Sequence, residues 1–414
     1  MTADDADALK AVEEAARAAR GTVADLAGVP AERLDQALRA IADTLLRESA
    51  PVLAANDADM TAAREAGIGG GLLDRLRLDQ ARLEGIAGQL RALAEVPAEP
   101  SQRPVRELPG GLRLVERCRP VGVIGANFEA RPNVVADIAS QFVKSRNAGV
   151  LRTGSAAIRS AIALADEVIA PALASAGLDP AMIQLVRVPG QSSARALVSQ
   201  PGLIPLVILR GSGDSTRSLA AEAARHGVRT MAHADGGAVL YVDAAADLAL
   251  AEQLIEASLD RLGVCNRLNL LLVHPGVWDE TLPRVRAVLD RLGIAVSLPP
   301  HAHPLGHEWA LDPGREATVT VAPADGPRAA AVLANEETSG LAAAIVTRDQ
   351  AAAGEFLGAY AGTGAFWNST TRLLDGFKLF NVPETGINID AVPGPRGPVT
   401  FRDLYLRQFV VTPL

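Results

Sequence analysis

The sequence predicts an α/β protein with two doubly wound domains and a small β element. The chain has 414 residues, which is more than one hydrophobic core usually serves. Short apolar strands alternate with helical segments twice, first over 121–209 and again over 265–367. A hairpin at 105–117 and an apolar tail at 399–411 add strand candidates outside both alternations.

Composition limits the classes of partner. Apolar residues make up 49% of the chain and charged residues 21%, which is a globular balance. The net charge of −8 argues against a nucleic-acid or anionic-membrane partner. No run of about 18 apolar residues predicts a membrane span, and we predict no metal site. The acidic start of the chain does not resemble a signal peptide, and two cysteines suggest no disulfide framework, so we expect a cytoplasmic protein.

The first hundred residues are predicted to be helical. Segments 3–28, 31–60 and 72–93 follow helical spacing, and the glycine-rich stretch 67–71 interrupts it. Three prolines between 97 and 104 mark a linker. We expect no catalytic residue in this region.

A hairpin and the first alternation follow. Residues 105–108 and 112–117 alternate in polarity around the turn Pro109-Gly110-Gly111. Cys118 comes next and is interpreted as incidental. Strands are predicted at 121–124, 149–151, 183–186 and 206–209, with helices at 132–145 and 156–176. Ligands of such sheets bind at the carboxyl ends of the strands.

The second alternation occupies the rest of the chain. Strands are predicted at 270–273, 318–321, 343–346 and 365–367, and helices at 280–292, 326–334 and 350–360. The tail at 399–411 has a strand-like pattern with aromatic residues. A hydrophobic terminal strand must pair in this subunit or in another.

One cysteine lies between a predicted helix and a predicted strand. Cys265 follows the helix-like segment Leu248–Leu262 and precedes Leu270–Val273. Gly263 can supply the tight bend that ends the helix. A thiol at such a bend can point into a cleft, where neighbouring amides lower its pKa and make it a nucleophile. The alternative is a small buried hydrophobe.

Three loops at predicted strand ends are candidates for ligand contacts. In the loop 150–155, Arg152 can bind a phosphate group. The Ser155 hydroxyl and the first backbone amides of the following helix can bind a second phosphate group. In 209–215, glycines let backbone amides approach an anion. The loop 122–133 carries Glu129, Arg131 and Asn133, three polar groups of different type. Ordinary strand-to-helix turns and a solvated loop are the alternatives.

At this point several stretches match one family. They are GVIGANFEARPNV (122–134), KSRNAGVLRTGS (144–155), GVCNRLNLLLVH (263–274), AFWNSTTRLLDG (365–376), PRGP (395–398) and GLLDRLRLDQARLEGIAGQL (71–90). The chain resembles the gamma-glutamyl phosphate reductase (glutamate-5-semialdehyde dehydrogenase) family of the aldehyde dehydrogenase superfamily, in order along its whole length. The resemblance implies an aldehyde-dehydrogenase-like fold and an oxidoreductase of proline biosynthesis.

The resemblance also implies a mechanism. Cys265 would attack an acyl phosphate, with L-glutamyl 5-phosphate as the leading candidate, and expel phosphate to leave a thioester that NADPH reduces to the aldehyde. The amide of Cys265 and a nearby side-chain donor, for which Asn266 is the candidate, would stabilise the oxyanion. His233 aligns with the glutamate that activates water in ordinary aldehyde dehydrogenases, so phosphate should be preferred over water. A hydrogen-bonded core histidine is the alternative, and Asp235 lies nearby.

The cofactor implied by the resemblance is NADP(H). Arg152 falls where the superfamily has a basic residue at the adenosine ribose, and arginine is a good partner for a 2′-phosphate. The other expected cofactor contacts are Lys144, Gly154, Ser155, Gly211, Ser212 and Glu384.

The substrate contacts implied by the resemblance come from two segments. They are Glu129, Arg131 and Asn133, together with Asn368, Ser369, Thr370 and Arg372. A plain surface charge is the alternative for Arg372. Leu341, Asn269 and Pro395 depart from the family pattern at the substrate rim, where the family usually has a histidine, an acidic residue and an alanine, so a paralogue acting on another acyl phosphate stays open.

The expected organisation follows the family. A cofactor-binding domain would comprise 1–104 and 120–245, a catalytic domain 246–390, and an oligomerisation element 105–119 and 391–414. We expect a homodimer or homotetramer acting on a small molecule. Two further alternatives stay open, a CoA-dependent aldehyde dehydrogenase and a catalytically silent scaffold subunit.

Overall fold

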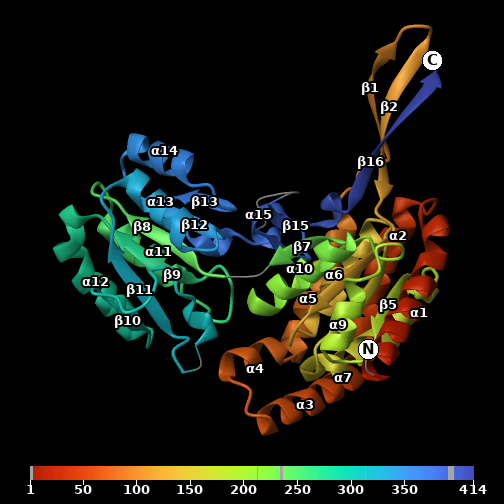
Figure 1. The fold of residues 1–414 in the computed structure, drawn as a ribbon, viewed down its shortest axis with the longest axis horizontal. Helices are drawn as coiled ribbons and strands as arrows, with labels where there is room; N and C mark the ends of the chain where they lie inside the picture. Colours follow the sequence, from red (N-terminus) through yellow and green to blue (C-terminus); the bar gives the residue numbers. More distant parts are fainter. Residues whose placement is uncertain (1–2, 212, 234–235, 313, 390–395) are drawn as a thin grey trace.

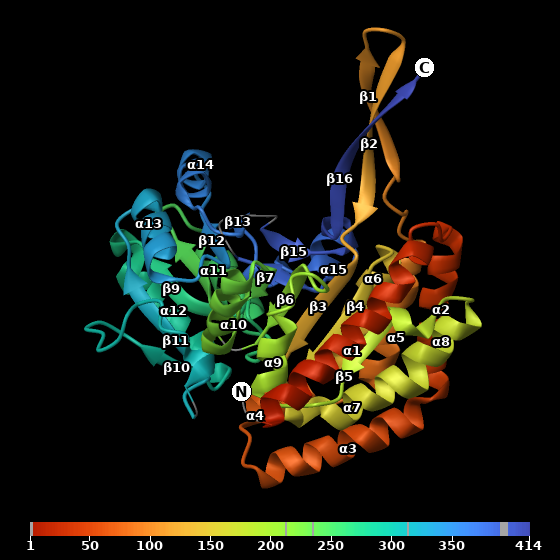
Figure 2. The same cartoon turned by 45° about the vertical axis from the view of Figure 1, so that its right-hand side comes forward.

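The computed structural model describes residues 3–211, 213–233, 236–312, 314–389 and 396–414. Two α/β bodies lie side by side, and a long β arm projects from one of them (Figures 1 and 2). This arrangement confirms the predicted fold class. Within the described residues, no helix has the length and apolar character needed to cross a bilayer.

The first sheet has five parallel strands in the order β5-β4-β3-β6-β7. Its strands are β3 (Val123–Phe128), β4 (Ala148–Thr153), β5 (Ile183–Val186), β6 (Leu206–Arg210) and β7 (Arg229–His233). Strand order reverses between β3 and β6, since β4 and β5 lie on one side of β3 and β6 and β7 on the other. The carboxyl ends of β3 and β6 therefore form the crevice where such sheets bind ligands. The short, partly polar strand β7 was not predicted.

Helices cover this sheet and complete the first domain. They are α1 (Ala3–Leu26), α2 (Ala31–Arg47), α3 (Ser49–Glu65), α4 (Gly70–Leu76), α5 (Gln80–Glu95), α6 (Asn133–Lys144), α7 (Ile158–Ala163), α8 (Ala170–Ser175), α9 (Gln191–Leu197) and α10 (Gly213–His226). A π-helical segment, Leu164–Ile169, links α7 to α8, so the predicted helix 156–176 is nearly continuous. α1 and α9 pack against β3 and β4, and α2 and α5 pack behind α6 (Figure 2).

Two predicted helices are each divided in the structure. The predicted helix 31–60 breaks at Glu48, whose φ of −94° and ψ of 27° separate α2 from α3. The predicted helix 72–93 breaks at Asp79, whose carboxylate accepts a hydrogen bond from the Arg82 amide and so caps a new helix, α5. Helical periodicity alone does not reveal such internal caps.

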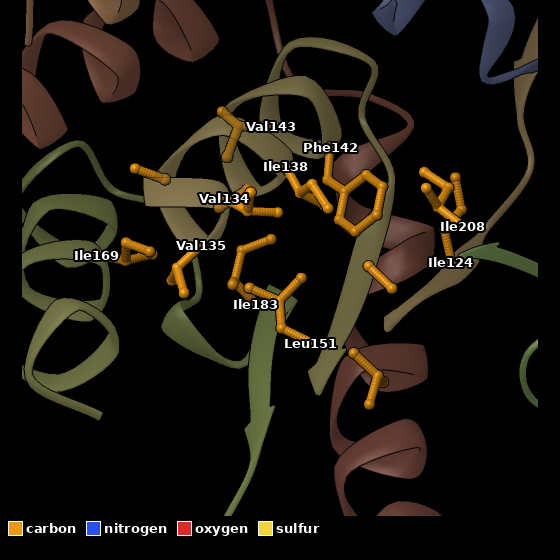
Figure 3. Packing of buried hydrophobic residues seen from close by; sticks show 14 of the residues in the cluster. Ile124, Val134, Val135, Ile138, Phe142, Val143, Leu151, Ile169, Ile183 and Ile208 are labelled. Atoms are coloured by element: carbon orange, nitrogen blue, oxygen red, sulfur yellow. The ribbon is translucent and has the colours of Figure 1, made fainter. Parts of the chain in front are cut away.

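The core of the first domain rests on close packing between α6 and the sheet. Figure 3 shows Val134, Ile138 and Phe142 of α6 among strand residues of the same buried cluster. The Phe142 ring lies directly over Gly149, where an added methyl group would come within 2.2 Å of it. Gly149 is therefore required by packing in the middle of β4.

The second sheet has six parallel strands in the order β10-β11-β9-β8-β12-β13. These are β8 (Ala238–Val242), β9 (Leu268–Val273), β10 (Ala295–Ser297), β11 (Thr318–Pro323), β12 (Ala342–Val346) and β13 (Gly364–Trp367). Its helices are α11 (Leu248–Ala257), α12 (Trp278–Arg291), α13 (Pro327–Glu337) and α14 (Gln350–Ala359). Alternate residues of β8 enter two separate cores, one with α11 and α12 and the other with α13 and α14.

The domain boundary lies earlier than predicted. β8, placed by the sequence division in the segment 120–245, pairs with β9 and β12 in the second sheet. The second sheet therefore begins at Ala238 and not after residue 245. β8 was missed as a strand because its apolar run follows the polar stretch 232–237 without a helical segment before it.

The arm is a three-stranded antiparallel sheet in the order β1-β2-β16. β1 (Gln102–Leu108) and β2 (Leu112–Pro120) form the predicted hairpin, and β16 (Tyr405–Pro413) pairs with β2 along its length. Gly110 and Gly111 both have positive φ, 83° and 71°, as the tight turn requires. The terminal strand therefore pairs within its own chain. Phe401, which precedes it, is buried in the first domain.

The remaining elements connect the second domain back to the first. They are α15 (Gly376–Phe380), β14 (Gly386–Asn388) and β15 (Gly397–Val399). β14 and β15 form a two-stranded antiparallel sheet beside β7. This return places residues 376–388 next to the carboxyl ends of β6 and β7.

Candidate active site

The loop that carries Cys265 joins α11 to β9. α11 ends at Ala257, so the predicted helix to Leu262 is too long. The Ser258 carbonyl accepts a hydrogen bond from the Leu268 amide at 2.9 Å, which ends the helical pattern and closes a loop over 259–267. The Ser258 hydroxyl also bonds the Thr370 hydroxyl at 2.8 Å.

The backbone of Cys265 is fixed by the glycine pair that precedes β8. The Gly237 amide donates to the Cys265 carbonyl at 2.7 Å, and the Ala238 amide donates to the Arg267 carbonyl at 2.9 Å. A methyl group at Gly236 would lie 3.0 Å from both Cα and O of Cys265. Cys265 is half-buried and packs against Ala238, Leu341 and other members of a small apolar cluster.

Three arginines from separate elements surround the thiol. Burial raises the pKa of Cys265 above its ordinary value, and the charges of Arg131, Arg210 and Arg75 offset part of that rise. Burial, with Arg210 and Arg75 as neighbours, in turn lowers the pKa of Arg131 to about 9. The guanidiniums favour the thiolate and any anionic group brought to it.

Two of these arginines were missed by the sequence analysis. Arg75 lies on α4, in the region where no catalytic residue was expected, and its Nε donates to the Gly263 carbonyl at 2.9 Å. Arg210 ends β6, and its buried Nε has no hydrogen-bond partner among the described residues. The signal for Arg210 was a charge at a strand end before a glycine loop. Arg75 was recognisable only as part of the GLLDRL match.

Asn266 binds the neighbouring segment with its whole side chain. Its Nδ2 donates to the Leu374 carbonyl at 2.9 Å, and its Oδ1 accepts from Arg372 Nη1. Its carbonyl accepts from the Thr371 hydroxyl at 2.9 Å. The side-chain amide thus anchors the cysteine loop to 371–374.

The segment predicted to bind substrate through 368–372 lies behind this loop. Arg372 Nε bonds Asp260 at 2.6 Å in addition to its bond with Asn266. Asn368, with a left-handed φ of 48°, bonds the backbone of Thr347 with both ends of its amide. Thr370 bonds Ser258, and Ser369 is half-buried. The segment positions the cysteine loop through these contacts.

Two partly buried carboxylates, Glu384 and Asp137, lie near Arg210. Glu384 accepts a hydrogen bond from the Gly376 amide at 2.6 Å, and burial raises the pKa of Glu384 to about 7. Asn133 Nδ2 donates to Asp137 at 2.9 Å, and burial raises the pKa of Asp137 to about 6. Arg210 lowers both values and so lies near both carboxylates. Asp137 was not singled out in the sequence.

Glu129 and Gly211 meet where β3 and β6 end. The Ser215 hydroxyl donates to Glu129 Oε1 at 3.0 Å. A methyl group at Gly211 would lie 3.2 Å from the Glu129 carboxyl carbon. The structure therefore brings together the two loops that the sequence analysis selected here. Ser212 lies outside the described residues.

Arg152 occupies the predicted strand end but faces into the protein. It is 4% exposed, and its guanidinium donates to Asn127 at 2.9 Å, to Ser193 at 3.1 Å and to the Gly190 carbonyl. Gly154 and Ser155 follow it; Ser155 is exposed, and a methyl group at Gly154 would meet no atom within 4 Å. The prediction that Arg152 offers its charge to a cofactor phosphate does not agree with these internal contacts.

Lys144 has a structural role and not the predicted cofactor contact. It is 1% exposed, and its Nζ bonds Asp35 of α2 at 2.6 Å. Because α6 runs back across the sheet from β3 to β4, its last residue lies at the amino edge of the strands, away from the crevice. The ion pair fixes α2 on α6.

Of three residues singled out in the sequence, the structure describes only the backbone of His233. His233 is the last residue of β7, and its backbone pairs with Arg210. Asp235 and Pro395 lie outside the described residues. Of the two other rim departures, Leu341 is fully buried beside Cys265, and Asn269 donates to the His307 carbonyl at 2.8 Å.

Comparison with known proteins gives consistent results. A family model described as the aldehyde dehydrogenase family matches residues 1–302. The solved gamma-glutamyl phosphate reductase of Thermotoga maritima is 25% identical, with 97% of this chain and 98% of that chain covered and a TM-score of 0.87. The Saccharomyces cerevisiae protein of the same name is 24% identical, with 97% and 96% covered and a TM-score of 0.51.

A more distant likeness concerns the fold alone. An acetylating aldehyde dehydrogenase of Geobacillus thermoglucosidasius is 15% identical, with 100% of this chain and 99% of that chain covered and a TM-score of 0.75. The two parallel sheets and the cysteine loop at the start of β9 agree with the family match over more than half of the sequence. The chain belongs to the aldehyde dehydrogenase family.

Proposed function

We propose that this protein reduces an acyl phosphate to the aldehyde with release of phosphate, through a thioester on Cys265. L-Glutamyl 5-phosphate is the leading substrate, as in proline biosynthesis. The observation that carries the proposal is the group of three arginines around a half-buried cysteine. The likeness to the Thermotoga maritima reductase over nearly the whole length of both chains supports the same substrate.

The chain's own residues account for the first half of the reaction. The positive charge of Arg75, Arg131 and Arg210 favours the thiolate of Cys265, which attacks the acyl carbon as phosphate leaves with the bonding electron pair. The same charges suit the phosphate of the substrate. Contacts from Asn266 and Arg372 hold the loop in place before the substrate binds. The reaction therefore does not bear the entropic cost of positioning the thiol.

We place the nicotinamide cofactor at the carboxyl ends of β3 and β6, where the strand order reverses. The space beside Gly154 is open, and Gly211 has no side chain beneath the Glu129 carboxylate. Glu129, Gly211 and Glu384 would hold the cofactor, which when bound supplies the hydride that reduces the thioester. The Arg152 guanidinium is engaged within the protein and gives no support for a 2′-phosphate contact. We therefore propose NADPH on the family resemblance alone.

The arm suggests how the protein assembles. Leu406, Phe409 and Val411 of β16 are 56%, 61% and 51% exposed on a sheet that projects from the body (Figure 1). A projecting apolar strand is usually covered by a partner. We propose a homodimer or homotetramer joined through this arm, working in the cytoplasm.

The reverse reaction tests the proposal. Purified protein is mixed with glutamate 5-semialdehyde, NADP and inorganic phosphate, and the reduced cofactor is followed by its absorbance. We expect phosphate-dependent reduction that is lost in Cys265→Ala and kept in Cys118→Ala, the matched control on the arm. If semialdehyde is inert while another aldehyde is oxidised with phosphate dependence, the glutamyl assignment fails and the acyl-phosphate chemistry stands. Turnover that requires CoA in place of phosphate would overturn both.

A further inference from the structure

A long connection between β10 and β11, residues 298–317, brings a carboxylate to the cysteine loop. Asn269, at the start of β9 and 2% exposed, binds both neighbours of Glu308. Its Nδ2 donates to the His307 carbonyl at 2.8 Å, and its Oδ1 accepts from the Trp309 amide at 3.3 Å. One side chain on β9, the strand that follows the cysteine loop, therefore fixes the backbone on each side of Glu308.

Further contacts make this connection rigid. Trp309 is 1% exposed, and its Nε1 donates to the Thr320 hydroxyl on β11 at 2.9 Å. The rings of His303 and His307 pack edge-on against Trp309, with centroids 4.7 and 4.6 Å away. A methyl group at Gly306 would come within 1.5 Å of the Glu337 carbonyl oxygen. The backbone around Glu308 is thus held by β9, β11 and α13 together.

The carboxylate of Glu308 lies against the glycine pair that supports Cys265. Its side chain is 13% exposed. Its Oε2 would be 3.2 Å from a methyl group at Gly236 and 2.6 Å from one at Gly237. The same position at Gly236 is 3.0 Å from the Cys265 Cα. Only glycine fits between the carboxylate and the backbone of the nucleophile.

Two arginines place the same carboxylate in the electrostatics of the site. Arg267 is fully buried, its Nη1 donates to the Glu316 carbonyl at 2.6 Å, and its Nη2 lies 3.8 Å from Glu308 Oε1. The charges of Cys265 and Glu308 both raise the pKa of Arg75, against the lowering effect of burial. Because Arg75 and Arg267 hold positions on either side of Cys265 in the loop, Glu308 acts on both supports of the nucleophile.

We propose that Glu308 is a positioning residue for Cys265: its carboxylate holds Arg267 and the Gly236–Gly237 turn and offsets part of the positive charge around the thiol. The proposal rests on the proposed function only in taking Cys265 as the nucleophile. Within the described part of the chain, the charged groups that act on the thiol include the three arginines and Glu384, and those that act on Glu308 include Arg75 and Arg267.

The charge part of the proposal has a definite sign. Without the carboxylate, attraction between Arg75 and the thiolate is no longer opposed, so the pKa of Cys265 falls. A general base acting on the thiol would give the opposite result, because its loss leaves the thiol harder to ionise. A purely packing role would leave the ionisation of the thiol unchanged in an isosteric variant.

The test measures the ionisation of Cys265 directly. In the full chain with Cys118→Ser, the rate of alkylation by iodoacetamide is recorded against pH without cofactor or substrate. Glu308→Gln keeps the shape and removes the charge, and it should lower the midpoint of the rate profile by about one pH unit. Glu336→Gln, an exposed glutamate on α13, should leave the midpoint unchanged.

A second variant keeps the proposal testable if Glu308→Gln does not fold. Asn269→Ala releases the segment 307–309 and should move the midpoint in the same direction. An unchanged midpoint in the folded variants, or a midpoint that rises, would overturn the proposal. Because alkylation needs neither acyl phosphate nor NADPH, these outcomes are independent of whether the protein acts on L-glutamyl 5-phosphate.

Discussion

At the scale of single residues, the thiol of Cys265 depends on charges that come from distant parts of the chain. Arg75 lies on α4, Arg131 follows β3 and Arg210 ends β6, and all three lower the pKa that burial raises. No local pattern around Cys265 contains this information. The environment of Cys265 is therefore a product of the tertiary fold, with the Gly236–Gly237 pair shaping the loop and the arginines supplying the positive charge.

Removal of one of these charges should lower the rate at which the Cys265 thiol is alkylated at neutral pH. We predict that Arg75→Gln raises the pKa of Cys265 and lowers the rate of iodoacetamide alkylation near pH 7 about tenfold, which corresponds to about 1.4 kcal/mol. Arg77→Gln, at the exposed end of the same helix, is the control. At a pH above the thiol pKa the two variants should react alike; a deficit that persists there would indicate a distorted loop instead.

Glu384 should make the stability of the protein depend on pH. Burial raises the pKa of Glu384 to about 7 from an ordinary value of 4.5, so the folded protein holds this proton more tightly than the unfolded chain does. Its contribution is complete below the ordinary value and is lost as the pH rises through about 7. We predict that the urea midpoint of Glu384→Gln falls less than that of the wild type between about pH 5 and pH 8. Parallel curves for the two proteins would contradict this assignment.

At the scale of elements, the segment 368–374 is the main support of the cysteine loop. Arg372 bonds Asp260 and Asn266, and Thr371 bonds the Asn266 carbonyl. These bonds cross between two loops that are about a hundred residues apart in sequence. Arg372 thus contacts Asn266, the neighbour of Cys265, and its guanidinium is engaged within the protein.

This geometry distinguishes two roles for Arg372. If it positions the loop, Arg372→Ala should lower kcat by at least about tenfold and leave KM for the acyl substrate and for phosphate nearly unchanged. Arg372→Lys should recover part of kcat because it keeps the charge beside Asp260. A large rise in KM at constant kcat would indicate instead that Arg372 binds the substrate directly.

The elements themselves were largely predictable from the sequence. The hairpin turn at Gly110–Gly111, the strand at 183–186 and the alternation in both domains follow from local polarity and turn residues. The missed features depend on contacts between distant segments. β8 is recognisable as a strand only when β9 and β12 pair with it. Asp79 begins a new helix, α5, through a capping bond within a sequence that has continuous helical periodicity.

The site was predictable in its residues more than in their roles. Arg131 and Glu384 act electrostatically on or with Cys265, and Glu129 approaches Gly211 where β3 and β6 end. Arg152 and Lys144 keep their motif positions, but Arg152 is engaged by Asn127 and Ser193 and Lys144 is paired with Asp35. Sequence shows which charges are present, whereas their availability to a ligand depends on packing that only the structure contains.

At the scale of the whole molecule, two α/β bodies and a projecting arm suggest an assembly that needs a second copy. The arm pairs its own three strands, yet the apolar side chains of β16 remain exposed. We predict that Phe409→Glu shifts the protein toward the monomer in light scattering coupled to size exclusion. Val332→Glu, an exposed apolar position on α13, should leave the mass unchanged. Equal masses for both variants and the wild type would exclude the arm as the contact.

In the proposed reaction, Cys265 carries an acyl group that phosphate, and not water, removes. Stopped-flow mixing of the protein with glutamate 5-semialdehyde and NADP in the absence of phosphate tests it most directly. We predict a burst of one reduced cofactor per chain that then stops and resumes when phosphate is added, with no burst in Cys265→Ala. Steady turnover without phosphate, or a burst that survives in Cys265→Ala, would contradict the account.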